Sequence, residues 1–524
     1  MAMGNSRRRH IHKKKKEKRR RAIALAAKDA MRGVAVLRSL DGVELAVPNA
    51  EACRYGAKVE EDIRFHHACG RTAGSSYNRK GCSTIHLDVQ SDILFKVIHC
   101  SNQQTHNPDW DGSKFVASLD HATLFDLVLA AESLRNQRLL DLTCHTVTDM
   151  IRGKSPAQIR AMFGIRPPPQ PKQGNPAKKK LPTPADRKPA TTLELEERAL
   201  RALHTVRCHK YTVYDPKHHC FLYTRLLHFN NYAFFDHDKE CELRRGPALH
   251  EIHPPLCESV VFSGVNFISL KVCESDVGFP INVFGTIIAR DEVDYKCVYL
   301  FRREVDDCQT ITSPDDMLTL MDPCRGLVPD DSVYLEFNLK IKCDEGAVKD
   351  FSKGVTEFNS CRLYYENESR TVRLTSWLST VELLCAGVFN PVEASIAISI
   401  LKGTCDLTRL AAWHTGNTED HIILYDSGLA ASNQATTKMS NSIALARSVV
   451  AVPLDEKLVL RFLVDDDDET EELLLILGPS NNEHKHVCKM SCCELEVRVA
   501  WTIVPKKRKR CNKWEVIGNQ HLLL

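Results

Sequence analysis

The chain has 524 residues, of which 26% are charged, and a formal net charge of +4 at pH 7. This length predicts more than one domain, and a charge so close to neutrality argues against binding of nucleic acid through overall basicity. Its apolar runs fall short of the roughly 18 residues that a membrane-spanning helix needs, so we expect no membrane partner. The 21 cysteines are scattered singly, which suits small buried side chains in a reducing compartment better than a disulfide framework.

Both ends of the chain are basic. Residues 7–21 are rich in Lys and Arg, and 506–510 repeat the pattern. Such runs are typical of nuclear import signals, of weak phosphate binding or of solubilising tails. No aromatic side chain interleaves the first run, and no hydrophobic signal region follows it. We therefore expect disordered tails at 1–30 and 506–524, and localisation in the nucleus and cytoplasm, with nucleic acid disfavoured as a partner.

The first folded elements are predicted to be a hairpin, a third strand and a helix. Apolar runs at 34–38 and 43–47 flank an Asp-Gly pair at 41–42, which favours a tight turn between antiparallel strands. Residues 85–87 then predict a strand. Helical spacing of apolar side chains at 91–100 predicts a helix.

The clearest local signals predict short amphipathic helices. Asp120 stands where an N-cap acceptor is needed, and apolar residues follow it at helical spacing. After a polar break at 135–137, a second apolar stripe runs to Ile151, and Gly153 follows as a terminating residue. We therefore expect two helices separated by this break.

A third helix has the most explicit start. Ser155 can cap it, Pro156 suits the first helical position, and Gln158 can complete a capping box. Helices this short are marginal alone, because nucleation is costly and about 12 to 15 residues are needed even for good helix formers. Their apolar stripes must therefore bury either in an ordinary helical subdomain or against a segment of another chain.

Residues 124–165, with a lead-in at Trp110, Asp111 and Phe115, closely resemble the helical half of the Skp-type (S-phase kinase-associated) adaptor family. The resemblance implies a non-catalytic subunit that joins an F-box protein to a cullin in SCF ubiquitin ligases. It also implies a POZ-like α/β fold upstream. The apolar residues that match the family's F-box-binding pattern, several of which can equally serve an internal core, are Leu142, Val147, Met150, Ile151, Ile159, Met162 and Phe163.

Two departures from the family weaken the implied activities. Glu132 and Ser133 stand where the family usually carries an Asn-Tyr pair that contributes to cullin contact, and losing an interface tyrosine can cost about 2 kcal/mol. The family continues after this region into acidic helices that clasp the F-box, whereas residues 167–189 are too rich in proline to propagate a helix. Residues 193–203 have a helical pattern that can replace the clasp, but we interpret it as a linker helix.

Beyond residue 205 the hydrophobic period changes from helical to two. The segments 333–341, 392–400 and 495–501 alternate between apolar and polar side chains, which predicts half-buried strands. Shorter runs between turn residues add further strands at 267–272, 281–289, 298–302, 421–425, 458–464 and 472–477. This spacing predicts an antiparallel sandwich or barrel, and about 300 residues leave room for two packed β-subdomains.

This second half resembles a domain of unknown function that is widespread in grasses. The resemblance covers roughly residues 205–505 and is carried by stretches such as VCESDVGFPINVFGTIIARDEVDYKCVYLFRRE and VAVPLDEKLVL. It implies a plant source, and it carries no assigned chemistry.

Candidate metal and catalytic sites are weak. His484, His486 and Cys488 share a strand face simply because they are two apart, and neither they nor the group at 218–220 have the paired spacing of a zinc module. The acidic run 465–472 offers oxygen ligands for calcium but is more typical of a solvated hairpin tip. No nucleophile elbow, glycine-rich phosphate loop or zinc-hydrolase helix occurs. We expect no metal, no cofactor and no catalysis.

The predicted fold is multidomain, with an α/β POZ-like and short-helix region followed by a large antiparallel all-β sandwich-type region. The predicted parts are a basic tail (1–30), a degenerate POZ-like domain (31–105), a Skp-like helical domain (106–165), a Pro- and Lys-rich linker (166–204), a β-rich domain (205–505) and a second tail (506–524).

Two functions remain open, and an enzyme hidden in the β-rich half is a third, weaker alternative. One is an adaptor that holds an F-box protein and a cullin and acts by proximity rather than by chemistry. The other is a binding or stress protein that works through its β-rich domain and retains the helices as a remnant. The first requires an apolar surface left open near residue 140.

Overall fold

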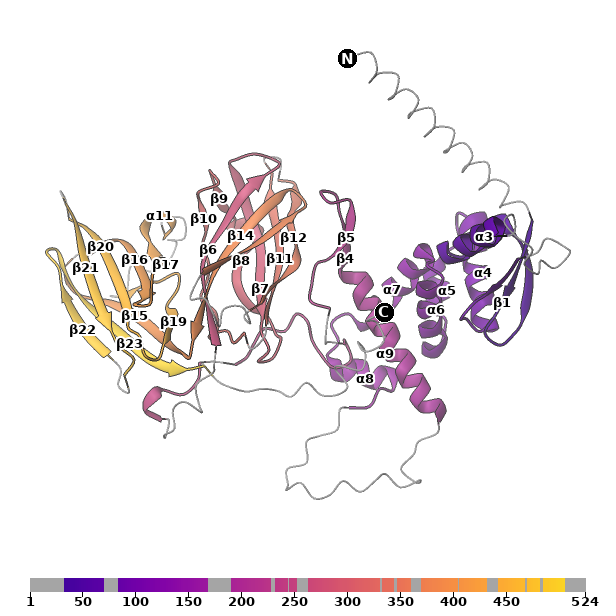
Figure 1. Cartoon of the computed structure of the whole chain (residues 1–524), viewed down its shortest axis with the longest axis horizontal. Coiled ribbons are helices and arrows are strands. Elements are labelled where there is room, and N and C mark those ends of the chain that lie inside the picture. The colour runs from indigo at the N-terminus through magenta and orange to yellow at the C-terminus, as the bar shows by residue number, and fades with distance from the viewer. Residues whose placement is uncertain are drawn as a thin grey trace, which may run out of the picture. The chain divides into compact units, whose positions relative to one another are not determined.

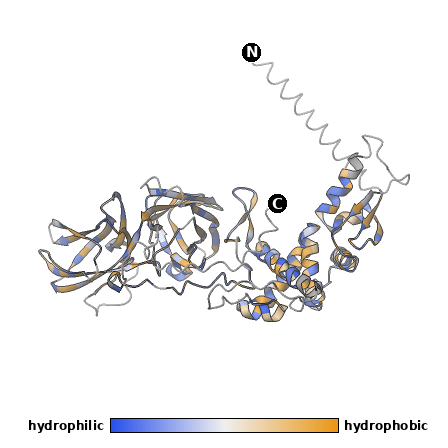
Figure 2. Ribbon diagram, turned by 60° about the horizontal axis from the view of Figure 1, so that its bottom comes forward, coloured by the Kyte–Doolittle hydropathy of each residue, from blue (hydrophilic) through white to orange (hydrophobic). Residues whose placement is uncertain are grey.

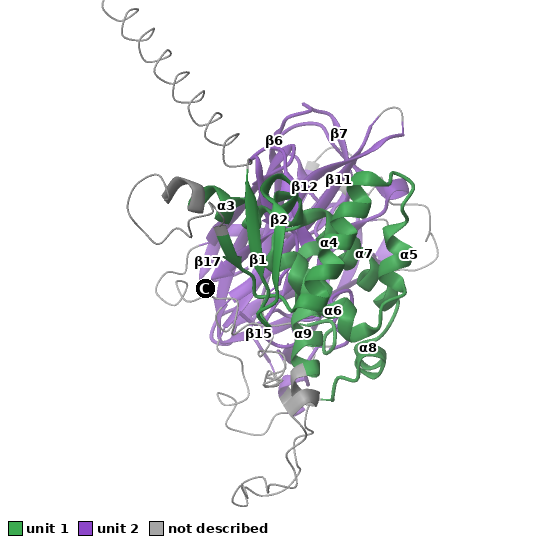
Figure 3. Ribbon diagram, turned by 90° about the vertical axis from the view of Figure 1, so that its right-hand side faces the viewer, with its two compact units in different colours: residues 1–210, 229–235, 513–524 green, residues 211–228, 236–512 purple. Residues whose placement is uncertain are grey.

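The computed structural model describes residues 33–69, 83–167, 190–227, 231–243, 245–251, 263–329, 332–343, 346–359, 369–403, 405–430, 442–466, 469–480 and 484–504. The chain divides into two compact units, which Figure 3 colours separately. The first unit comprises residues 1–210, 229–235 and 513–524, and the second comprises 211–228 and 236–512. No helix among the described residues has the length and apolar character that a membrane crossing requires.

The first unit begins with a three-stranded sheet. β1 (Val34–Arg38) pairs antiparallel with β2 (Glu44–Pro48) and parallel with β3 (Ser83–His86). Gly42 lies in the turn between β1 and β2 with φ of +84°, a conformation that glycine adopts without steric cost. The predicted hairpin and third strand are confirmed.

Helices make up the rest of the first unit. Those that precede or flank β3 are α2 (Asn49–Ala52), the 3-10 turn η1 (Cys53–Tyr55), α3 (Ala57–Cys69), α4 (Ser91–His106) and α5 (Gly112–Ala117). α4 continues to His106, beyond the predicted end at residue 100, and its buried face includes Ser101. The sheet and these helices share one hydrophobic core with the helices that follow.

The three predicted amphipathic helices are confirmed as α6 (His121–Ser133), α7 (Gln137–Ile151) and α8 (Pro156–Phe163). Asp120 caps α6, since its Oδ1 accepts a hydrogen bond from the Thr123 amide at 3.1 Å. At α8 the capping box is complete: the Ser155 hydroxyl accepts from the Gln158 amide, and Gln158 Oε1 accepts from the Ser155 amide. The local signals therefore set the ends of these helices.

The helix α9 (Ala190–Tyr211) differs from the linker helix that we expected at 193–203. It is longer, and its apolar side chains lie in the same core as those of α6, α7 and α8. The buried residues, each at most 4% exposed, are Ala199, Leu200, Ala202, Leu203 and Val206. A linker helix would leave this stripe in water, whereas burial of each large aliphatic side chain gains about 1.5 to 3 kcal/mol.

The second unit is antiparallel β-structure, as predicted. After the small hairpin of β4 (Thr212–Asp215) and β5 (Cys220–Tyr223), it forms two sandwiches with separate hydrophobic cores. We call residues 263–389 the first sandwich and residues 391–503 the second sandwich. Figure 1 shows the strands of each.

One sheet of the first sandwich has the order β10 (Met317–Leu318), β6 (Ser263–Ser275), β14 (Ser379–Phe389), β13 (Ser369–Ser376). The other has the order β12 (Val348–Asn359), β11 (Ser332–Lys342), β7 (Ile281–Arg290), β8 (Val298–Arg303), with β9 (Gln309–Ile311) also on β7. Side chains from both sheets meet in one core.

One sheet of the second sandwich has the order β18 (Ser442–Ile443), β15 (Pro391–Gly403), β23 (Cys493–Ile503), β22 (His484–Lys489), with β19 (Val449–Pro453) also on β15. The other has the order β17 (Asn417–Asp426), β16 (Asp406–His414), β20 (Leu458–Asp466), β21 (Glu469–Leu477).

The alternating segments are confirmed as sandwich strands, and Figure 2 shows the interspersed hydrophobic and hydrophilic residues along them. On β11 the inward side chains are at most 4% exposed: Val333, Leu335, Phe337, Leu339 and Ile341. On β23 they are at most 3% exposed: Leu495, Val497, Val499 and Trp501. The period of two therefore identified the apolar core faces correctly, but not the opposite faces, on which Glu336 of β11 and Glu393 of β15 are buried as well.

Candidate partner-binding site

The residues that the sequence assigned to F-box binding lie on α7 and α8, and they fall into two groups. The buried group, at most 7% exposed, comprises Val147, Ile151 and Ile159. The partly exposed group comprises Leu142, Met150, Met162 and Phe163. Only the second group keeps surface that another molecule can touch.

Leu142 and Phe163 are held in place by aromatic neighbours. Gly112, at the start of α5, has no room for a side chain, because a Cβ there would come within 2.8 Å of Trp110 and 2.9 Å of Leu142. The Phe163 ring packs edge-on against Phe125 of α6, with 4.9 Å between the ring centroids. Leu142 and Phe163 are therefore positioned by residues of α5 and α6 within this chain.

Polar contacts hold α9 along α6. Arg198 Nη1 donates to Asp126 Oδ2 at 2.6 Å, and the Thr205 hydroxyl donates to Glu132 Oε2 at 2.8 Å. Burial raises the pKa of Asp126, and the hydrogen bond and charge of Arg198 oppose that shift. Glu132, one of the two residues assigned to cullin contact, therefore also binds the chain's own α9.

Further contacts tie α9 to α7 and to the end of α8. His209 Nε2 lies 2.7 Å from Asp141 Oδ1 on α7. The buried Glu196 carboxylate accepts from Arg166, which follows α8, through the backbone amide at 2.9 Å and through Nε at 2.8 Å. These interactions connect α9 to each of the three predicted helices, so the packing of α9 is specific.

Residues 231–235 return to the first unit and cover α8 and α9. The Asn231 side chain donates to the Leu200 carbonyl at 2.9 Å, and Arg160 of α8 donates to the Ala233 carbonyl at 2.6 Å. The guanidinium of Arg160 lies over the Phe234 ring, 5.7 Å from its centroid. Sequence reasoning missed both this segment and the buried face of α9. The aromatic run at 232–235 was the signal available.

The geometry does not support the candidate metal sites that the sequence offered in the second unit. Among the described residues, no group of three or more His, Cys, Asp or Glu side chains is arranged to hold a metal ion. His486 and Cys488 lie on β22, and the side chain of His484 lies outside the described residues. The acidic run lies on the β20–β21 hairpin, which pairs through Asp466 and Glu469, as the hairpin interpretation predicted.

Comparison with known families confirms the two resemblances. Residues 137–172 match the family described as "Skp1 family, dimerisation domain", and residues 264–499 match a domain of unknown function, DUF6598. The chain therefore combines a Skp-type helical region with a separate β-rich domain whose role is unassigned.

The relatives of the N-terminal part are named Skp-like proteins. SKP1-like protein 11 of Arabidopsis thaliana is 46% identical over 88 residues, which cover 15% of this chain and 57% of that protein. SKP1-like protein 1 of Oryza sativa subsp. japonica is 47% identical over 106 residues, covering 15% and 60%. The SCF ubiquitin ligase complex protein SKP1a of Dictyostelium discoideum is 40% identical over 94 residues, covering 15% and 58%.

The chain thus spans less than two thirds of the length of these relatives, between 57% and 60%. Among solved structures, the C2A and C2B domains of extended synaptotagmin 2 align with 52% of this chain and 97% of that chain at 8% identity. The TM-score is 0.17, too low to support any conclusion about the β-rich region.

Proposed function

We propose that this chain is a non-catalytic Skp-type adaptor in an SCF-type ubiquitin ligase, acting in the nucleus and cytoplasm. The observation that carries the proposal is the match of residues 137–172 to the Skp1 family, together with the folding of this stretch into α7 and α8. The adaptor raises the effective concentration of whatever the β-rich unit carries near ubiquitin transfer, without performing chemistry.

The partner of the helical region is proposed to be an F-box protein that presents an apolar segment. Leu142, Met150, Met162 and Phe163 keep part of their surface exposed with α9 in place, so docking does not require α9 to leave. Val147, Ile151 and Ile159 support this surface from inside the core. The residues proposed to contact the partner are therefore fewer than those that the sequence resemblance implied.

A pull-down with an immobilised F-box peptide tests this proposal. We expect the wild-type chain to be retained at micromolar concentration and Met150→Asp to be lost, because a charge placed in an apolar interface is desolvated without a partner. Leu40→Asp is the matched control, since Leu40 is 61% exposed in the first unit and belongs to neither α7 nor α8. Circular dichroism checks that both variants fold. Absence of wild-type retention, or equal retention of both variants, contradicts the proposal.

Cullin docking through Glu132 and Ser133 is the least supported part of the adaptor function. Glu132 is already bound by Thr205 of α9, and neither residue supplies an aromatic anchor. Mass spectrometry of the full chain purified from cells that express it is the decisive measurement. Cullin peptides are expected if docking occurs, and F-box peptides without cullin peptides restrict the proposal to the F-box half.

A second candidate is a binding protein that acts through the β-rich unit. It is favoured by the packing of α9 against the Skp-like helices of the same chain. Leu200, Leu203 and Val206 of α9 are buried in the shared core, each at most 4% exposed. In this case the helices are a structural remnant, and neither F-box nor cullin peptides co-purify. The same mass spectrometry experiment separates the two functions.

A further inference from the structure

The strand β21 forms an open edge of the second sandwich. It is the last strand in the order β17, β16, β20, β21, and among the described residues it pairs on one side only, with β20. This pairing keeps one register from Glu469 to Leu477, without a bulge. The backbone amides and carbonyls on the outer side of β21 therefore face away from the sheet and can pair with a further strand.

The side chains of the second half of β21 are apolar on both faces. On the face turned away from the core, Leu474 is 52% exposed and Ile476 is 55% exposed. On the core face, Leu473 and Leu475 are only partly buried, whereas their partners on β20 are fully buried. An additional strand beside β21 would cover apolar surface on both faces.

The other terminal strands of the four sandwich sheets have features that prevent pairing with a further strand. Short length, bulges and basic side chains all protect a sheet edge in this way. β10 and β18 have two residues each, the pairing of β8, β12 and β17 is interrupted by register shifts, and β13 and β22 carry Arg or Lys. β21 has nine residues, without Lys, Arg or Pro, and its three glutamates all lie in its first half. Among the described terminal strands of these sheets, β21 is the least protected.

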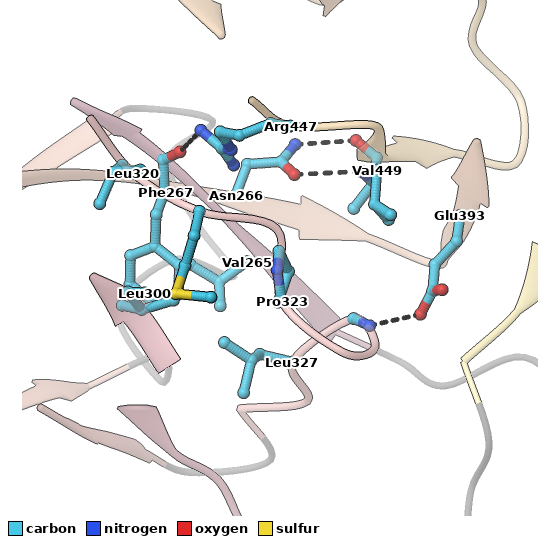
Figure 4. A pocket seen from close by; sticks show the side chains of 13 residues that line it. Val265, Asn266, Phe267, Leu300, Leu320, Pro323, Leu327, Glu393, Arg447 and Val449 are labelled. Atoms are coloured by element: carbon cyan, nitrogen blue, oxygen red, sulfur yellow. Dashed lines mark hydrogen bonds between the residues drawn. The ribbon is translucent and has the colours of Figure 1, made fainter. Parts of the chain in front are cut away.

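The first sandwich binds the second through other strands. The Asn266 side chain of β6 donates to the Ala451 carbonyl of β19 at 2.8 Å and accepts from the Ala451 amide at 3.0 Å. Arg447 Nη1 donates to the Phe267 carbonyl at 2.6 Å, and Figure 4 shows these hydrogen bonds. These contacts hold the second sandwich without using β21.

The apolar run at 473–477 is complementary to itself. An antiparallel pair of two such runs can have a two-fold axis at Leu475. Leu474 of one copy then lies opposite Ile476 of the other on the exposed face. The leucines at the two ends of the run lie opposite each other on the core face. Every apolar side chain of the run thus meets another apolar side chain.

The charges of β21 are compatible with the same register. Glu472 of one copy would lie opposite Gly478 of the other, and Glu471 opposite Pro479, so no carboxylate faces another. Within its own chain Glu472 is already paired with Arg461 Nη2 at 3.0 Å. Pro479 has no amide N–H to donate, so the pairing ends there.

We propose that β21 is a self-association edge, through which two copies of this chain form a two-fold symmetric dimer. The four-stranded sheet of each copy joins that of the other across the paired runs at 473–477. The partner is a second copy because the run offers its own mirror in sequence, with the acidic half of each strand placed outside the apolar pairing. This inference depends only on the second sandwich and is independent of the adaptor function.

Sedimentation of the reduced full chain between about 1 and about 100 μM tests the proposal. We expect the mass of the wild-type chain to rise towards twice that of one chain. Ile476→Lys should raise the dissociation constant at least about tenfold, because it places an unpaired charge in an apolar interface. Val487→Lys is the matched control, since Val487 is 54% exposed on the terminal strand β22 of the other sheet, and it should sediment as the wild type does.

Circular dichroism checks that both variants fold. A wild-type chain that stays monomeric throughout this range assigns the edge to a strand of another protein and overturns the proposal. Association of Ile476→Lys that equals that of the wild type overturns it as well.

The register is tested by disulfide cross-linking with oxidised glutathione. Leu474→Cys and Ile476→Cys are prepared separately and then mixed. In the mixture the two new thiols lie directly opposite, with Cα atoms about 4.5 to 5.5 Å apart, which suits a disulfide. In either variant alone the new thiols are diagonal neighbours about 7 to 8 Å apart, which is too far. Peptide mass spectrometry should find the link between positions 474 and 476 in the mixture, and dithiothreitol should remove it. Absence of this link, or equal cross-linking in the single variants, overturns the proposed pairing.

Discussion

Two buried glutamates of the second unit have opposite environments. Glu336 on β11 accepts hydrogen bonds from Arg290 and Arg225; burial alone would raise its pKa, but these cations lower it. Glu393 on β15 is equally buried, and its Oε2 has no hydrogen-bond partner among the described residues. Burial raises the pKa of Glu393 to about 7. Only the second carboxyl takes up a proton near neutral pH.

This difference predicts a pH-dependent stability. Because the folded pKa of Glu393, about 7, exceeds the reference value of 4.5, the folded state binds more protons between these values. Stability is therefore lost as pH rises from about 4.5 to about 7, by about 3 kcal/mol for complete ionisation.

Replacement of the Glu393 carboxyl by an amide should remove this loss of stability at higher pH. We expect Glu393→Gln to unfold at higher urea concentration than wild type at about pH 8 and to differ little at about pH 5. Glu336→Gln is the control for a carboxylate that is paired in the folded state. It should destabilise the protein at both pH values, because it leaves Arg290 and Arg225 without their buried partner. An equal urea midpoint for Glu393→Gln and wild type at the higher pH would refute the assignment.

At the scale of elements, α9 decides what the Skp-like helices can bind. Its buried stripe and its contacts with Asp126, Glu132 and Asp141 make it a packed member of the first unit. The surface left for the proposed F-box partner is then limited to the side chains of α7 and α8 that remain partly exposed. The proposed adaptor function depends on that remaining surface.

The packing of α9 predicts a large mutational effect. We expect Leu203→Ala to destabilise the first unit by about 2 to 5 kcal/mol, because Leu203 is fully buried and a cavity is left behind. Leu195→Ala on the same helix, at a side chain that is 43% exposed, should change stability by about 0.5 kcal/mol or less. Thermal unfolding followed by circular dichroism measures both. Equal effects would mean that α9 is the linker helix first expected.

At the scale of the whole molecule, the chain passes between the two units more than once. It leaves the first unit after residue 210, returns for 229–235, and then enters the second unit again. The sequence patterns predicted a single β-rich domain that begins at residue 205 and includes residues 229–235. The first unit therefore includes residues 229–235, which follow strands β4 and β5 of the second unit in the sequence.

This return predicts that a residue distant in sequence stabilises the Skp-like region. Asn231→Ala removes the 2.9 Å hydrogen bond that the buried Asn231 side chain donates to the Leu200 carbonyl and the 3.0 Å hydrogen bond that it accepts from the Ala233 amide. We expect a loss of about 1 to 3 kcal/mol in the stability of the first unit. Hydrogen exchange of α9 amides provides the measurement. Unchanged protection there, with loosened amides only in the second unit, would contradict the assignment of 231–235 to the first unit.

Local sequence determined the elements whose signals lie within a few residues. The Asp-Gly turn, the caps at Asp120 and Ser155 and the alternation along β11 and β23 each depend on short-range geometry, and each was predicted correctly. The helical period of 3.6 and the strand period of two also identified the apolar faces that are buried, because each period places the apolar side chains on one side of its element.

Only the tertiary structure decided which buried groups meet. The docking of α9 on α6, the return of Asn231 to Leu200 and the contact of Arg325 with Cys241 join residues tens of positions apart. No local pattern encodes such pairs, since hydrophobic burial is non-directional and selects no particular partner. The partner is chosen by how whole elements pack, which a single sequence does not display.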